Sequence, residues 1–288
     1  FTPLLVGVIL ALVFAACIFG GSRQISRITE VLVPFMGIFY LAVALFVTVT
    51  HYTLIPKMFS DIFSNAFDIR AIFGGFTGSC VMNGIKRGLF SNEAGVGSAP
   101  NAAASAAVSH PVKQGLVQML SVFIDTILIC SATACLLLCS GVAPSEELKG
   151  MPWVQAAASE SLGGFGTVFI TVALCLFAFT TLIGNFYYAE MGLKYLCGKT
   201  PGKALLNLFR IIAALIVLAG AVMEFGLVWS TADVLMGFMA LINLPVILLL
   251  GGTAIRCMKD YVRQKKEGRN PVFKAADIGL KEKTDFWD

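Results

Sequence analysis

Residues 91–101 interrupt an otherwise apolar stretch with groups that could bind a small charged ligand. Gly95, Gly97 and Pro100 each weaken a continuous helix, and Asn92 and Glu93 add polar side chains. A helix that breaks at membrane depth leaves N–H groups that can face a carboxylate and carbonyl groups that can face a cation. The segment is therefore typical of a binding site built on a discontinuous helix.

Three further polar side chains stand in apolar stretches. Thr180 and Thr181 are adjacent hydroxyls, and oxygen atoms suit a hard cation, although threonine also bonds back to its own helix carbonyls. Asp125 lies about three turns into another apolar stretch, where an unpaired charge is costly. It would serve either in ion coupling or as a structural ion pair or hydrogen-bond partner.

Composition indicates the solvent in which the chain folds. Hydrophobic residues make up 57% of the chain and charged residues 13%, against roughly 25% charge in a soluble domain. We therefore expect an all-α polytopic membrane protein. The eight cysteines form no CxxC pair, so we expect small packing residues rather than disulfides or metal ligands.

Six stretches are long and apolar enough to cross a membrane, which takes about 20 residues. We predict helices over residues 3–20, 31–53, 112–142, 163–193, 204–223 and 228–255, and a broken crossing over 70–109. Residues 1–255 would form the transmembrane domain. We expect solvated side chains at the span ends, on Glu190, Glu224 and Asp233.

Loop charges predict the orientation. Most of the 21 Lys and Arg residues fall in alternate loops and in the tail, residues 256–288, which the positive-inside rule assigns to the cytoplasm. We expect this tail to be extramembrane, and its simplest interpretation is a solvated segment that also touches anionic headgroups. The loops on either side of residues 70–109 then lie on opposite sides, so this segment crosses an odd number of times. A surface loop at 91–101 is the alternative, which the parity argues against.

Several motifs resemble those of one known family. They are Arg-Gly-Leu-Phe-Ser-Asn-Glu-Ala-Gly (87–95), Gly-Ser-Ala-Pro-Asn-Ala (97–102), His-Pro-Val-Lys-Gln-Gly (110–115), Phe-Ile-Asp-Thr (123–126), Phe-Thr-Thr-Leu-Ile-Gly-Asn-Phe-Tyr-Tyr-Ala-Glu (179–190) and Met-Gly-Phe-Met-Ala-Leu-Ile-Asn-Leu (236–244). Over nearly the whole chain they resemble the sodium:alanine/glycine symporter family, the amino acid carrier proteins. The resemblance implies a leucine-transporter-like inverted-repeat fold. The chain would supply core helices 4 to 10, as a C-terminal fragment without the first three core helices.

The resemblance also implies roles for particular residues. Phe90, Ser91, Asn92 and Gly95 match the family motif on the break and would line the amino-acid pocket. Glu93 would either hold the unwound segment together or lie near the substrate ammonium group.

A later stretch carries the other implied site residues. Thr180 and Thr181 occupy the position of a sodium site in this fold, and Gly184 and Asn185 follow about one turn later, along the substrate pocket. Many family members carry tryptophan where Asn185 stands. A smaller, polar wall leaves pocket size and substrate choice open.

The function implied by the resemblance is secondary active symport rather than enzymatic catalysis. Na⁺ influx would drive uptake of alanine or glycine by alternating access, with no cofactor, in the plasma membrane of a prokaryote with the C-terminus in the cytoplasm. The expected partners are the amino acid, Na⁺ and the lipid bilayer, with no nucleic acid. The alternatives are another small amino acid, H⁺ coupling, an ion channel, or an intramembrane enzyme using Asp125 and Glu93 as an acid–base pair.

Overall fold

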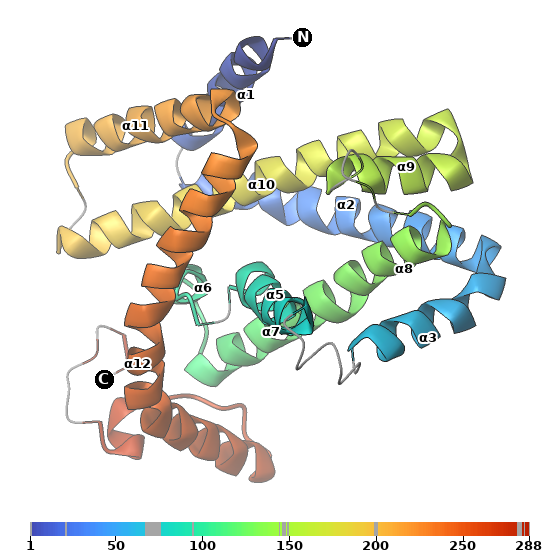
Figure 1. Ribbon diagram of the computed structural model, residues 1–288. Coiled ribbons are helices and arrows are strands. Elements are labelled where there is room, and N and C mark those ends of the chain that lie inside the picture. The colour runs from blue at the N-terminus through green and yellow to red at the C-terminus, as the bar shows by residue number, and fades with distance from the viewer. Residues whose placement is uncertain are drawn as a thin grey trace. The chain divides into compact units, whose positions relative to one another are not determined.

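The structure is a computed structural model, and every regular element in the part of the chain that it describes is a helix (Figure 1). The described residues are 2–20, 22–66, 76–93, 95–143, 145, 148, 150–198, 201–280, 284 and 286–287. They fall into two compact units, Phe1–Gly88 with Ile124–Glu224, and Leu89–Phe123 with Phe225–Asp288. The start of the predicted broken crossing, residues 70–75, lies outside the described residues.

The first unit contains most of the helices that the apolar stretches predict. Its elements are α1 (Pro3–Phe19), α2 (Ser22–Thr50), the 3-10 turn η1 (Tyr52–Leu54), α3 (Ile55–Ala66), most of α5 (Phe76–Ser91), the π-helix η2 (Ile124–Cys130), α8 (Ser131–Cys139), α9 (Met151–Leu162), α10 (Gly164–Leu196) and α11 (Lys203–Val222). Proline stands in the first turn of α1 and α9, where its missing N–H would have no helical partner in any case.

Small residues allow close approach between α9 and α10 in this unit. Ala157 and Ala158 are fully buried, and a Cβ atom on Gly166 would lie 2.3 Å from the backbone oxygen of Ala158. Only glycine fits at this crossing. On the other side of the same core, the Tyr40 hydroxyl of α2 lies 2.7 Å from the Thr133 hydroxyl of α8. These contacts join α2, α8, α9 and α10.

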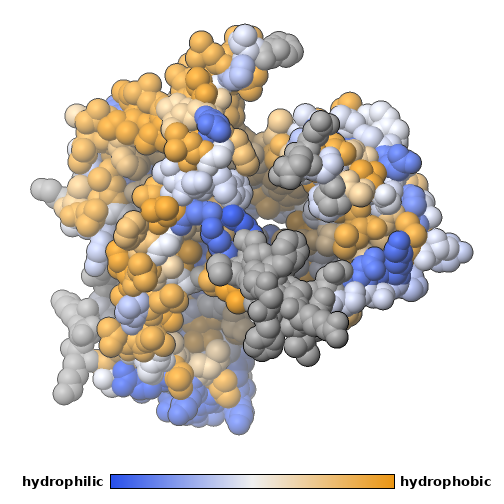
Figure 2. Space-filling model, viewed as in Figure 1, coloured by the Kyte–Doolittle hydropathy of each residue, from blue (hydrophilic) through white to orange (hydrophobic). Residues whose placement is uncertain are grey.

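A second cluster packs α1 against α10 and α11. Phe14 meets Phe186 edge to face, with 5.9 Å between the ring centroids. Gly7 lies so close to α11 that an added Cβ atom would be 2.8 Å from the Ala221 Cβ. The outward faces stay apolar, as the hydrophobic surface over α11 shows (Figure 2), and such faces suit contact with lipid.

Five helices in the described part of the chain are long and apolar enough to cross a membrane. They are Thr29–Thr50, Pro111–Cys139, Gly164–Leu196, Lys203–Val222 and Phe225–Lys266, and they overlap five of the six predicted spans. The sixth, α1, is apolar but has 17 residues, slightly fewer than the roughly 20 of a straight crossing. Which helices cross, and in which direction, stays a prediction.

The span predicted over residues 112–142 contains a π-helical stretch. It consists of α7 (Pro111–Phe123), the π-helix η2 and α8, which ends at Cys139. Asp125 stands in the first turn of η2. A π-helical stretch shifts the register of the side chains that follow it and is frequent at functional sites.

Glu190 of α10 is buried, so the predicted solvated side chain is wrong at this position. Its side chain is about 3% exposed, with Oε1 2.7 Å from Lys194 Nζ and Oε2 3.6 Å from Arg210 Nη2. The Arg210 guanidinium also lies 5.7 Å from the centre of the Phe19 ring. The carboxylate thus links α10, α11 and the end of α1, and the pairing offsets the cost of burying a charge.

The second unit is organised around α12 (Phe225–Lys266), a 42-residue helix with Pro245 inside it. Its other elements are the end of α5, α6 (Ala99–Ala103), α7 and the 3-10 helix η3 (Ala275–Ile278). The predicted transmembrane domain ends at residue 255, but α12 continues without interruption into the tail. Figure 2 shows hydrophilic residues over this last part of α12.

The tail then folds back on the segment that precedes α7. Ser109 Oγ donates to the Pro271 carbonyl at 2.9 Å, and Phe273 N donates to the Ser109 carbonyl at 2.9 Å. The side chain of Phe273 is buried, as are those of Ala275 and Ile278. We predicted a solvated tail; residues 271–278 are instead packed, because their apolar side chains find a partner surface around residue 110.

His110 stands at the centre of this contact and is fully buried. Tyr261 and Phe273 pack edge-on against its ring, each with 5.2 Å between centroids. Its Nδ1 accepts a hydrogen bond from Val112 N at 3.2 Å. The proton of the neutral ring is therefore on Nε2, which faces Asp260 Oδ2 at 3.4 Å.

The Glu190 ion pairs predict a strong effect of removing the carboxylate. Glu190→Ala should lower the free energy of unfolding by about 3 kcal/mol, because Arg210 would remain buried without its partner. The measurement is the unfolding midpoint of the purified protein in detergent. The matched control is Glu224→Ala, since Glu224 is an exposed carboxylate two residues after the end of α11. Equal midpoints for the two variants would contradict the structural role.

The His110 contact predicts that tail docking weakens in acid. Burial lowers the pKa of His110 below its ordinary value of 6.5, although Asp260 opposes this shift. The undocked state then binds the proton more readily, so docking is strongest above pH about 6.5 and weakens as the pH falls below it. Protonation would also abolish the bond from Val112 N. The other charged groups near the ring are Lys113 and Arg263.

Amide hydrogen exchange over residues 271–278 measures this docking, comparing parent and variants at each pH. In the parent, protection should fall from pH 7.5 to 5.5 after correction for intrinsic exchange. His110→Gln should remove the pH dependence, and His51→Gln, at a histidine outside this contact, should preserve it. Identical pH profiles in the parent and His110→Gln would show that another group is responsible.

Candidate functional site

The helix break predicted at residues 91–101 is a turn between two helices of the second unit. α5 ends at Ser91 and α6 begins at Ala99. Gly95 and Gly97 have positive φ angles of 81° and 90°, and Glu93 is the single non-glycine residue with a positive φ among those described, at 50°. Left-handed conformations cost little at glycine and more elsewhere, so the turn depends on both glycines.

Glycine is also required here by the closeness of α12. A Cβ atom on Gly95 would lie 2.9 Å from Leu244 Cδ2, and one on Gly97 would lie 2.8 Å from Asn243 Cγ. Both distances are shorter than real Cβ contacts, so the side chains of Leu244 and Asn243 or the turn itself would have to shift. The two glycines therefore serve two purposes, the turn conformation and the approach of α12.

Two asparagine side chains bind the carbonyl groups of the break. Asn243 Nδ2 donates to the Gly95 carbonyl at 3.0 Å. Asn101 Nδ2 lies 3.2 Å from both the Gly97 and the Ser98 carbonyl. Asn243 was not among the residues predicted to line the site, and sequence reasoning missed this contact. Its signal was an amide in an apolar helix, where a polar side chain needs a partner.

The N–H groups of the break are less well satisfied than its carbonyl groups. Val96 N donates to the Glu93 carbonyl at 3.3 Å and Asn101 N to the Ser98 carbonyl at 3.0 Å. The N–H groups of Gly97 and Ser98 have no acceptor among the described residues. Successive free N–H groups in a turn are a common binding site for a carboxylate.

Glu93 closes the turn on itself. Its Oε2 accepts a hydrogen bond from Ser98 Oγ at 2.6 Å, across the unwound residues. The contact is of the kind expected if Glu93 holds the segment together, the first of its two predicted roles. The second role, beside the substrate ammonium, stays a prediction.

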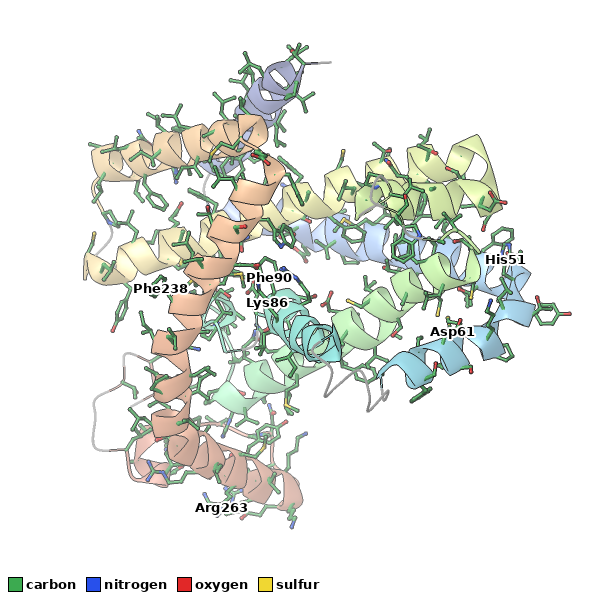
Figure 3. The ribbon with its side chains drawn as sticks, viewed as in Figure 1. His51, Asp61, Lys86, Phe90, Phe238 and Arg263 are labelled. Carbon is green, nitrogen blue, oxygen red and sulfur yellow. The ribbon has the colours of Figure 1, made fainter. Side chains whose placement is uncertain are left out.

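The remaining residues of the predicted pocket wall lie at the end of α5. Lys86 and Phe90 are one turn apart on this helix (Figure 3). Phe90 stacks on Trp229 of α12, with 5.7 Å between centroids and 22° between ring planes. Ser91 is exposed and Asn92 is half-buried. Trp229 is a second neighbour of the break that sequence reasoning missed.

The predicted sodium ligands lie on α10, in the first unit. The Thr180 hydroxyl donates to the Leu176 and Phe177 carbonyls at 3.0 Å each, and the Thr181 hydroxyl donates to the Phe177 carbonyl at 2.9 Å. This is the back-bonding given above as the alternative. It leaves lone pairs on both oxygens, so the two interpretations are compatible.

The other two predicted site residues of α10, Gly184 and Asn185, have free space around them. A Cβ atom on Gly184 would meet nothing within 4 Å, and Asn185 is exposed. Asp125, which lies on η2, is half-buried. No group of three His, Cys, Asp or Glu side chains suited to a metal ion occurs in the described part of the chain. The structure thus brings Phe90, Glu93 and Gly95 together around the break and places the two threonines, Gly184 and Asn185 on one helix.

Comparison with known proteins shows which family this sequence matches. The sequence model of the sodium:alanine symporter family matches residues 1–275. The amino-acid carrier protein AlsT of Bacillus subtilis is 43% identical over 285 residues, which cover 99% of this chain and 60% of AlsT. The sodium/alanine symporter AgcS of Methanococcus maripaludis is 40% identical, over 93% of this chain and 59% of AgcS.

A further relative differs in the substrate of its name. The probable sodium/glutamine symporter GlnT of Bacillus subtilis is 42% identical, over 94% of this chain and 56% of GlnT. The chain spans about three fifths of the length of the curated relatives it matches. On the extent of the family match, this chain belongs to the sodium:alanine symporter family.

Proposed function

We propose that the protein is a secondary active symporter that couples Na⁺ influx to the uptake of a small amino acid, alanine or glycine. Membership of the sodium:alanine symporter family supports sodium-coupled amino acid transport. The observation that carries the proposal is the turn between α5 and α6, because its free N–H groups offer a place for the substrate carboxylate.

The carboxylate would bind the N–H groups of Gly97 and Ser98. Nearby, Ser91 and Asn92 would add side-chain hydrogen bonds, and the stacked rings of Phe90 and Trp229 would form an apolar wall. A small pocket with a few polar groups and an aromatic wall is typical of small-molecule sites.

Sodium would bind oxygen ligands that include Thr180 and Thr181. Na⁺ is the transported ion, and its binding must favour the same conformation as the amino acid if one gradient is to drive the other. Each ligand should then raise the affinity for the other by the same factor. Leucine-transporter-like alternating access is part of this proposal.

Glutamine is the second candidate substrate. GlnT, one of the relatives, is named for glutamine. Competition of glutamine with labelled alanine separates the two candidates.

The proposal is tested by uptake of labelled alanine into proteoliposomes containing the protein expressed from its complete gene. An inward Na⁺ gradient should drive saturable uptake, and replacement of Na⁺ by choline should reduce it at least tenfold. Thr181→Val should weaken apparent sodium affinity about tenfold or more, because a hard-cation ligand is replaced by a methyl group. Thr171→Val, at an exposed threonine of the same helix, is the control. Equal uptake in choline would refute sodium coupling.

The turn yields a separate prediction about substrate binding. Gly97→Ala should weaken alanine binding at least tenfold, because the added methyl collides with Asn243 and the positive φ is strained. Gly252→Ala, where a Cβ atom meets nothing within 4 Å, should bind like the parent. Calorimetry in Na⁺ buffer measures both. Alaninamide, which lacks the carboxylate, should compete poorly; if it competes like alanine, the N–H groups do not bind a carboxylate.

A further inference from the structure

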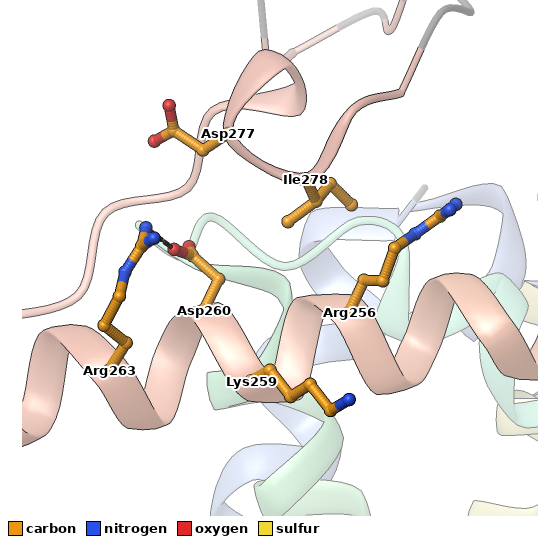
Figure 4. A pocket seen from close by; sticks show the side chains of 6 residues that line it. All are labelled: Arg256, Lys259, Asp260, Arg263, Asp277 and Ile278. Carbon is orange, nitrogen blue, oxygen red and sulfur yellow. Dashed lines mark hydrogen bonds and ion pairs between the residues drawn. The ribbon is translucent and has the colours of Figure 1, made fainter.

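A basic hollow opens where the apolar part of α12 ends (Figure 4). Its volume is about 300 Å³, and it is lined by Arg256, Lys259, Asp260, Arg263, Asp277 and Ile278. The first four belong to α12, and the last two belong to η3 of the folded tail. The hollow therefore has two walls held together by the tail contact around His110, rather than a row of separate side chains on one helix.

A second hollow adjoins the first along α12. It has a volume of about 410 Å³ and is lined by Met258, Lys259, Val262, Arg263 and Lys266. Lys259 and Arg263 line both hollows. Met258 and Val262 are exposed apolar side chains one turn apart. The same stretch of helix thus presents basic groups beside an apolar strip.

The positive charge of these hollows is only partly compensated. The Asp260 carboxylate is already engaged: it accepts from Gln264 Nε2 at 2.8 Å, faces His110 and pairs with Arg263. Arg256 donates to the Thr253 hydroxyl at 3.1 Å. Neither Arg256 nor Lys259 forms an ion pair with any residue that the structure describes. Asp277 is the second carboxylate of the first hollow, whose three basic side chains therefore outnumber its two acidic ones.

Their place in the sequence puts these cations next to lipid. Leu248 and Leu249 are 81% and 82% exposed, and Ile255, directly before Arg256, is 58% exposed. If the apolar part of α12 crosses the membrane, Arg256 and Lys259 follow at the depth of the phosphate groups. Long basic side chains at a span end reach for this layer, and arginine pairs well with phosphate oxygens.

We propose that Arg256 and Lys259 bind the phosphate group of an anionic phospholipid, while Arg263 stays paired with Asp260. Met258 and Val262, in the adjoining hollow, contact the apolar part of the same lipid. The site is specific because the folded tail closes it, in contrast to a solvated basic collar that attracts anionic lipid only through its net charge. It is independent of the amino-acid and sodium sites.

Retention of phosphatidylglycerol during native mass spectrometry of the purified protein, expressed from its complete gene, tests the site. The parent should retain phosphatidylglycerol saturably and in preference to phosphatidylcholine. The double variant Arg256→Gln/Lys259→Gln should bind it about 30-fold more weakly, since each basic residue near the surface contributes about fivefold. Arg263 is left unchanged because it pairs with Asp260.

A charge-matched control separates a site from net charge. Arg269→Gln/Lys274→Gln removes two exposed charges that line neither hollow and should bind like the parent. Equal weakening in both double variants, or equal retention of the two lipids, would overturn the proposal. Excess inorganic phosphate should not displace the lipid; complete displacement would assign the site to free phosphate instead.

Discussion

The polar backbone of the turn between α5 and α6 is the constraint on which the second unit depends. Residues 92–93 and 95–98 belong to no helix. If the turn lies at membrane depth, as predicted, lipid cannot satisfy their N–H and carbonyl groups, each of which costs several kcal/mol when unpaired. Asn243 reaches the Gly95 carbonyl from α12, which is possible only because positions 95 and 97 carry no side chain. The two glycines therefore make room for α12, and Asn243 of α12 in turn satisfies a carbonyl group of the turn.

Buried carboxylates near helix ends also connect separate segments of the chain through polar contacts. Glu190 joins α10 to α11 through Arg210, and Asp260 joins α12 to the segment before α7 through His110. Apolar helix faces discriminate little between a neighbouring helix and lipid. A buried charge tolerates few arrangements, because separation from its partner leaves it unpaired. The polar clusters thus supply specificity that the apolar faces lack.

Composition and local pattern predicted the helices and the break, because both depend on neighbouring residues. Apolar runs set the helix extents, and Gly95, Gly97 and Pro100 marked the turn. Contacts between distant residues were not predictable in this way. Glu190 looked solvated because it stands near a span end, yet Arg210, twenty residues later, buries it. The tail looked solvated because its basic residues are visible in sequence, whereas its packing depends on Ser109 and His110.

The asymmetry of the turn bears on what it can bind. A broken helix was expected to offer N–H groups to an anion and carbonyl groups to a cation, but the Gly95, Gly97 and Ser98 carbonyls are occupied by asparagine amides. The N–H groups of Gly95, Gly97 and Ser98 have no acceptor among the described residues. The local field therefore favours a carboxylate over a sodium ion. In the proposed symport, the oxygen ligands for sodium would therefore come from other elements, and the adjacent hydroxyls of Thr180 and Thr181 on α10 are of the chemical type that a hard cation prefers.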